Sequence, residues 1–148
     1  MKKFRFTLQP VATVRDLQEM RAREGFALAV REVGARSQAL SQQQLRVAEF
    51  VEALIAGRET GFAAAMQASF LRAYREEVAA ERKALDALTQ AEQERELARR
   101  RWIDTHVQLR LVEKLRDRAR ERHAADGARF EQRQLDDRAP RGDLFPTT

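Results

Sequence analysis

Apolar residues recur at helical spacing through the first third of the chain. Val11, Val14 and Leu17 open the pattern, and a set of apolar residues spaced seven apart follows. This set comprises Phe26, Val33, Leu40, Val47 and Leu54. A seven-residue apolar repeat is the seam of a coiled coil. The pattern therefore predicts a first helical arm over residues 8–56.

The second half of the chain repeats this pattern after a short polar interruption. The sequence GRETG at Gly57–Gly61 brings two glycines close together and predicts the turn of a helical hairpin. A second arm is predicted over residues 62–139, followed by a disordered tail over residues 140–148. Its seam continues in seven-residue steps from Tyr74. These steps fall on Glu81, Leu88, Arg95, Trp102, Leu109, Arg116, His123 and Phe130.

Folding the chain at this turn decides which residues face each other. Leu40 then lies opposite Ala80, and Val11 lies opposite Leu109, close to the start of the first arm. The stretch from Glu113 to Pro140 is therefore expected to project beyond its partner, and its scarcity of large apolar side chains suits an unpaired helix. The predicted fold is all-α. It is a long antiparallel two-helix coiled coil, a helical hairpin, with an overhanging C-terminal helix.

Composition supports helices and narrows the range of functions. Of the 148 residues, 34% are charged, and the mean hydropathy of −0.62 leaves little material for a compact core. The absence of cysteine favours a reducing compartment, and no apolar run approaches the roughly 20 residues of a membrane span, so a cytoplasmic protein is expected. The net charge is +5, but acidic and basic residues alternate. Alternation is typical of solvated helix faces. We therefore expect no nucleic-acid partner, and a basic coiled-coil module that binds nucleic acid stays as an alternative.

No catalytic chemistry can be read from the sequence. His106 and His123 are too far apart to form a zinc pair on one helix face. Neither a P-loop nor a dinucleotide-binding glycine motif is present. Carboxylates are abundant, but a two-helix hairpin has no enclosed pocket in which to shift their pKa values. We expect no enzymatic activity, no cofactor and no metal.

Aromatic and arginine clusters remain as candidate surfaces. Trp102 follows the run Arg99–Arg101 and is either a packing residue opposite the first arm or an interface anchor. Phe50, Phe70 and Tyr74 come together near the turn once the arms pair. They either close the core there or stand outside it for a partner. The arginine runs at residues 99–101 and 116–122 are typical of solvated faces, with docking of an acidic partner as the alternative.

The ends of the chain resemble those of a known family. KFRFTLQPVATVRDLQEMRARE at residues 3–24 is similar to the opening of FliJ, the flagellar type III export protein. FEQRQLDDRA at residues 130–139 is similar to the acid-amide and Leu-Asp signature of that family. Between them, RRRWIDTHVQLRLVEKLRDR resembles the segment that precedes the signature. The resemblance covers nearly the whole chain, and the order and position of these motifs together carry it.

This resemblance implies a non-enzymatic, stalk-like component of the flagellar export machine. FliJ proteins insert into the hexameric export ATPase, FliI, link it to the export gate protein, FlhA, and escort export chaperones as they are recycled. The chain would then associate with the membrane export apparatus through protein partners. The equivalent stalk protein of a virulence-type secretion system is the alternative.

Two groups of site residues follow from the hairpin and the resemblance together. The projecting helix end is expected to meet the ATPase ring through Arg116, Arg120, Glu131, Gln132, Leu135 and Asp136. The export gate is expected to contact Phe50, Phe70 and Tyr74 near the turn. On this interpretation FEQRQLDDRAP, residues 130–140, is a surface that another protein binds rather than the frayed end of a solvated helix.

Overall fold

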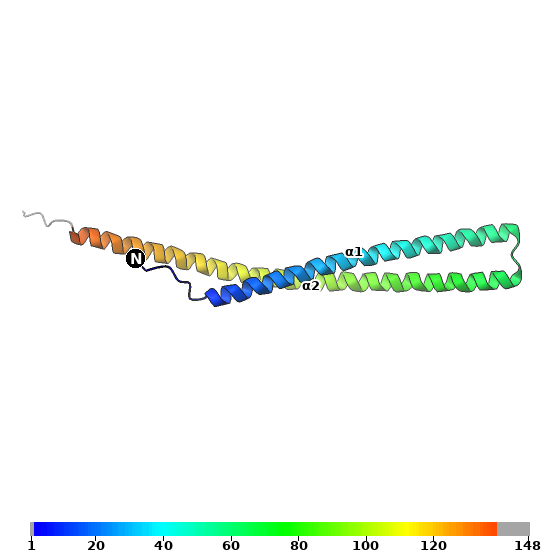
Figure 1. The fold of residues 1–148 in the computed structure, drawn as a ribbon, viewed down its shortest axis with the longest axis horizontal. Helices are drawn as coiled ribbons and strands as arrows, with labels where there is room; N and C mark the ends of the chain where they lie inside the picture. The colour runs from blue at the N-terminus through cyan, green and yellow to red at the C-terminus, as the bar shows by residue number, and fades with distance from the viewer. Residues whose placement is uncertain (1, 139–148) are drawn as a thin grey trace, which may run out of the picture. The chain divides into compact units, whose positions relative to one another are not determined.

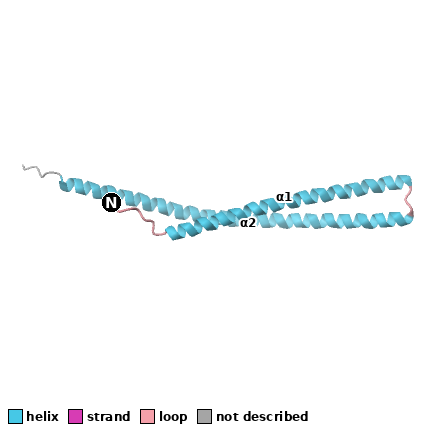
Figure 2. Ribbon diagram, viewed as in Figure 1, coloured by secondary structure: helices cyan, strands magenta, loops and turns pink. Residues whose placement is uncertain are grey.

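The computed structural model describes residues 2–138, and nearly all of them lie in two helices. Helix α1 spans Gln9–Thr60 (52 residues) and helix α2 spans Ala64–Arg138 (75 residues). The two helices run in opposite directions on either side of the short connection at residues 61–63 (Figure 1). Residues 2–138 contain no strand, and residues 2–8 precede α1 as a loop (Figure 2). The predicted all-α hairpin is confirmed, while the predicted tail at 140–148 lies outside the described residues.

The two helices contribute to two compact units. The hairpin unit, Glu19–Asp104, contains the turn and the longer part of the helix pair. The terminal unit contains residues 2–18, from the start of the chain, and residues 105–138 of α2. The terminal unit therefore combines two stretches that are far apart in the sequence, whereas the hairpin unit is one continuous stretch.

The predicted seam lies between the helices of the hairpin unit. Leu40 is buried, and the other apolar residues of the α1 repeat, from Phe26 to Leu54, are half-buried. The side-chain amide of Gln43 donates a hydrogen bond of 3.0 Å to the carbonyl oxygen of Glu77. Gln43 comes three residues after Leu40, and Glu77 comes three residues before Ala80. This bond therefore confirms the predicted pairing of Leu40 with Ala80.

A second column of seam positions is filled mainly by alanine. On α2 this column lies three residues after the positions that repeat from Tyr74, and it includes Ala84, Ala91 and Ala98. Ala91 is only 4% exposed. Small side chains at the contact allow two helices to approach closely. The sequence analysis weighed large apolar side chains and missed this column, because alanine is also common on exposed helix faces.

The turn lies later than the sequence predicted. Gly57 to Thr60 continue α1, and the chain reverses at residues 61–63, so the predicted turn at Gly57–Gly61 is wrong in its first four residues. Gly61 has φ of 80°, the left-handed conformation that commonly ends a helix. Gly57 has a different role, because a Cβ atom there would overlap the ring of Phe62. The first glycine therefore makes room for an aromatic ring, and the second reverses the chain.

The start of α1 differs from the prediction in the residues that it buries. Val11, Val14 and Leu17 are 42%, 53% and 45% exposed, whereas Ala12 is 7% exposed. Ala12 lies two seven-residue steps before Phe26, so the seam keeps its register through small or polar residues. In the same unit Leu109 and Val112 of α2 are buried. The prediction that Val11 lies in the seam is therefore wrong. It followed the hydrophobicity of the side chain, whereas the seven-residue register selects Ala12.

Candidate partner-binding surfaces

Residues 2–8 lie along α2 in the terminal unit, where the sequence predicted an unpartnered helix. The carbonyl oxygen of Lys2 is 3.0 Å from Nε2 of His123. The ring of Phe4 meets the imidazole of His123 edge to face, with centroids 5.5 Å apart. The guanidinium of Arg120 lies over the same Phe4 ring at 5.8 Å. The prediction that α2 has no intramolecular partner beyond Val112 is therefore wrong for the stretch that ends near His123.

The reach of an extended chain explains this difference. Seven extended residues cover about 23 Å at roughly 3.3 Å per residue, and the same length corresponds to about 15 helical residues at 1.5 Å each. A short loop can therefore follow several turns of α2 beyond the point where α1 begins. The sequence analysis treated these residues only as the approach to the first arm. Phe4 and Phe6, both half-buried, were the signal that could have revealed the contact.

The six residues predicted to meet the ATPase ring fall into two groups. Arg116 is half-buried and Arg120 exposed, and both border the N-terminal loop. The other four lie on the last turns of α2, where every residue from 128 to 138 is exposed. There the amide of Gln132 donates to the carboxylate of Asp136 at 3.0 Å along the helix. Leu135 is 62% exposed. Glu131 is exposed as well.

Three phenylalanine rings pack beside the turn of the hairpin unit. Phe70 lies 5.3 Å from Phe50 and 5.7 Å from Phe62, measured between ring centroids. Tyr74 follows one helical turn later and is half-buried. Of the predicted cluster near the turn, Phe50 and Phe70 are in contact, and Phe62 is a member that the sequence analysis missed. Phe62 directly follows Gly61, so its place at the turn could have drawn attention to it.

A shallow hollow opens beside these rings. Phe62, Ala65, Met66, Ser69 and Phe70 line it, and its volume is about 480 Å³. Met66 is 61% exposed. Aromatic rings thus close the core at the turn, and an exposed thioether offers an adaptable apolar contact next to them.

Trp102 is a packing residue of the hairpin unit. Its indole stacks on the ring of Phe26 at a centroid distance of 5.5 Å and an interplanar angle of 15°. Its Nε1 donates a hydrogen bond of 2.9 Å to the carboxylate of Glu19, which is only 6% exposed. The packing interpretation of Trp102 is confirmed. Glu19 was missed, although it lies one seven-residue step before Phe26.

The family of the chain follows from comparison with known proteins. The family model described as Flagellar FliJ protein matches residues 4–142. The chain belongs to the FliJ family. Comparisons with the curated proteins and with the solved structures gave no match.

Membership of the FliJ family makes this chain a component of flagellar type III protein export. The match includes residues 4–8 of the N-terminal loop, both helices and the FEQRQLDD motif. No helix within residues 2–138 is long and apolar enough to cross a membrane.

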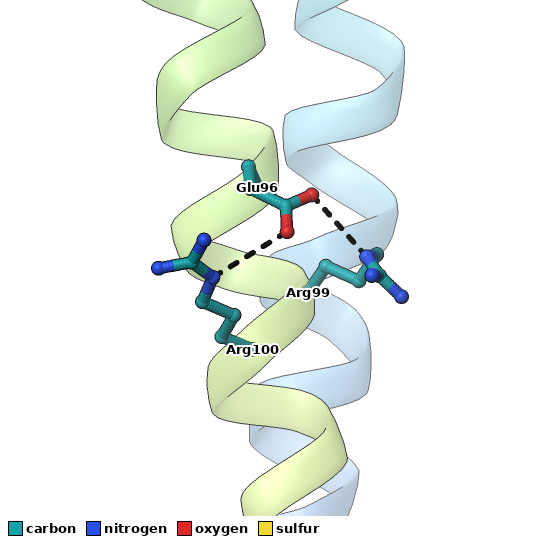
Figure 3. Close-up of polar contacts among 3 residues, drawn as sticks. All are labelled: Glu96, Arg99 and Arg100. Carbon is teal, nitrogen blue, oxygen red and sulfur yellow. Dashed lines mark hydrogen bonds and ion pairs between the residues drawn. The ribbon is translucent and has the colours of Figure 1, made fainter.

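The arginine run at residues 99–101 is a solvated face of this FliJ-family chain. Arg99 and Arg100 hold the carboxylate of Glu96 from the same helix at 3.2 Å and 3.4 Å (Figure 3). The hydrogen bond from Arg99 and the charges of both guanidinium groups hold the pKa of Glu96 below its ordinary value. All three side chains are about half exposed or more. Ion pairs of this kind support the helix weakly.

Neither histidine takes part in a metal site of the described structure. Within residues 2–138, no three His, Asp or Glu side chains are grouped so that they could hold a metal ion. His123 packs against the N-terminal loop.

Proposed function

We propose that this protein is the stalk of the flagellar export ATPase. In this role it inserts into a hexameric FliI-like ring, couples the ring to a FlhA-like export gate and helps to recycle export chaperones. It performs no chemistry itself. Membership of the FliJ family supports a role in flagellar export. The separate positions of the two exposed surfaces, at the end of α2 and at the turn, support one partner for each.

One observation carries the contact with the ATPase. Helix α2 continues beyond both α1 and the N-terminal loop, and every residue from 128 to 138 is exposed. A helix end without tertiary neighbours gains little stability from its own sequence. This stretch nevertheless bears the FEQRQLDD motif and two large apolar side chains, Phe130 and Leu135, which are 57% and 62% exposed. A ring that surrounds this end would cover them. Glu131, Gln132 and Asp136 would set its register, and Arg116 and Arg120 would extend the contact along α2.

The gate contact is assigned to the aromatic turn. Met66 and the accessible edges of Phe50, Phe70 and Tyr74 present apolar surface there, and the hollow lined by Phe62 and Phe70 is open to a partner side chain. Aromatic and methionine side chains are favoured at the centres of protein interfaces.

Removal of residues 130–148 tests the ATPase contact. A deletion that begins at Arg116 would also remove the His123 and Arg120 contacts of the N-terminal loop, whereas one that begins at Phe130 leaves them intact. We expect the truncated protein to keep its helicity per residue and its melting temperature, yet to lose stimulation of the purified export ATPase. Steady-state phosphate release measures the stimulation.

A length-matched control separates the motif from the helix that carries it. In this control, residues 130–138 are replaced by an alanine, glutamate and lysine helix of equal length. We expect this variant to behave like the truncation. Normal stimulation by the truncated protein would contradict the proposed ATPase contact, and normal stimulation by the control alone would assign the effect to helix length.

A further inference from the structure

The N-terminal loop and α2 border two hollows of different chemistry within the terminal unit. The first has a volume of about 690 Å³. Its walls include Phe4, Arg5, Phe6, Arg116 and Arg120. The second has a volume of about 430 Å³, and Lys2, His123, Asp126, Gly127 and Phe130 line it. Both hollows therefore depend on the loop lying against α2.

The described residues that line the first hollow carry positive charge without an acidic side chain among them. The Nε atom of Arg116 is buried and has no hydrogen-bond partner among residues 2–138. Arg120 lies over the Phe4 ring. Other arginines of the chain pair with an acid on their own helix, namely Arg23, Arg36, Arg99, Arg100, Arg110 and Arg129.

The second hollow offers an apolar contact. Phe130, which lines this hollow, is 57% exposed. Gly127, one helical turn earlier, has no side chain to cover the helix surface between Phe130 and His123. An apolar side chain of a partner could rest there against an aromatic ring, and aromatic rings are favoured anchors in interfaces.

The two hollows follow one another along the same helix. Phe130 comes ten positions after Arg120, which corresponds to about 15 Å at 1.5 Å per residue. An extended peptide covers this distance with four to five residues at about 3.3 Å each. One short segment of a partner can therefore reach both hollows.

We propose that the N-terminal loop and the stretch of α2 from Arg116 to Phe130 form a docking surface for a short acidic segment of a partner protein. Carboxylates of that segment bind Arg116 and Arg120, and an apolar side chain four to five residues away packs against Phe130. Arginine binds carboxylates well because its planar fork can donate two hydrogen bonds at once.

The surrounding charges favour a peptide over nucleic acid. Asp117 and Glu121 flank Arg116 and Arg120 in the sequence, and Asp126 lines the second hollow. A phosphate backbone, with one charge at every nucleotide, would meet these acids as well as the arginines. A peptide with acids only at the arginine end places an apolar residue, rather than a charge, beside Asp126.

Fluorescence anisotropy with a labelled synthetic peptide tests the proposal. The peptide carries two adjacent glutamates, four serine or glycine residues and one leucine, and it is made in both chain directions. The full-length protein is titrated into it at low and at physiological salt. We expect binding that weakens when the glutamates become glutamines. The double variant Arg116→Gln and Arg120→Gln should weaken it roughly tenfold or more, because bonds to charged groups are lost.

Matched variants separate this surface from general charge attraction. Arg118→Gln with Arg122→Gln removes two exposed arginines from the same helix and should change the affinity by less than about twofold. Phe130→Ala should weaken binding of the leucine peptide and leave a peptide with glycine in place of leucine unaffected. This second comparison also tests the proposal if the arginine variant loses helicity in circular dichroism.

Three outcomes would overturn the docking surface. They are equal losses in the two arginine variants, no binding of either peptide, and tighter binding of a 20-base-pair DNA duplex that depends on Arg116 and Arg120. The last outcome would identify a phosphate site. The peptide assay contains no ATPase, so its failure leaves the proposed stalk function standing, and failure of the truncation test leaves the docking surface standing.

Discussion

The indole of Trp102 donates a hydrogen bond of 2.9 Å to the carboxylate of Glu19, across the seam of the hairpin unit. Glu19 is 6% exposed and lies 3.9 Å from Arg23. A buried carboxylate is costly unless hydrogen bonds and charges compensate it. The pair therefore favours the observed register of the two helices, because a shift by one residue would separate the carboxylate from its indole donor.

Trp102→Phe should destabilise the hairpin. Phenylalanine retains most of the stacking on Phe26 but removes the indole donor from Glu19, which should cost about 1.5–3 kcal/mol. Adding Glu19→Leu to this variant should recover much of the loss, because an apolar residue suits a seam position. Urea unfolding followed by circular dichroism measures both effects. A stability for Trp102→Phe equal to that of the wild type would show that the bond does not hold the register.

Alanine at Gly57 should lower stability, whereas alanine at Gly25 or Gly34 should raise it. A Cβ atom at Gly57 would overlap the Phe62 ring, and the displaced ring should cost about 1–3 kcal/mol. Among residues 2–138, nothing lies within 4 Å of a Cβ atom at Gly25 or Gly34, so alanine there should contribute about 0.5–1 kcal/mol through helix propensity. Melting temperatures of the three single variants provide the comparison. The same direction of change at all three positions would contradict the packing of Phe62 on α1.

Glu96→Gln should reduce stability slightly at neutral pH and have no effect in acid. Because the pKa of Glu96 is lowered in the folded protein, its stabilising effect is present above the unfolded pKa. That effect is lost as the pH falls through the folded pKa. Denaturation midpoints of the wild type and the variant should therefore converge below about pH 3, where carboxylates are protonated. Glu92→Gln, at an exposed position of the same helix, is the control. A difference that persists in acid would show that the loss does not come from the ion pairs.

Phe70→Ala and Met66→Ala should separate the core from the surface at the turn. Phe70 packs between Phe50 and Phe62, so its removal should cost about 1–3 kcal/mol of hairpin stability for a half-buried ring. Met66 is 61% exposed, and its removal should leave stability within about 0.5 kcal/mol of the wild type. If the export gate binds at the turn, Met66→Ala should still weaken binding of the purified gate domain. Calorimetric unfolding and a gate-binding titration measure the two properties. Unchanged gate binding by Met66→Ala would move the gate contact away from this hollow.

The sequence by itself determined the helices, the hairpin and the register of its seam. Seam positions recur every seven residues, from Phe26 to Leu54 and from Tyr74 onward. This periodicity is local in the sequence, and a coiled-coil helix pair requires it. The Gln43–Glu77 bond shows that the periodicity predicts the register correctly over the hairpin unit. The FliJ family is likewise indicated by sequence alone, through the order of the motifs at the two ends of the chain.

Only the tertiary structure decided which side chains fill the seam and what covers α2 beyond α1. Val11 and Val14 are more hydrophobic than Ala12, yet Ala12 is buried, because the close approach of two helices favours small side chains at the contact. The docking of Phe4 on His123 joins residues more than a hundred positions apart. No periodicity in the sequence encodes such a contact, since the loop that makes it is not helical. The hollows at Arg116 and Phe130 depend on that loop, and so they exist only in the folded chain.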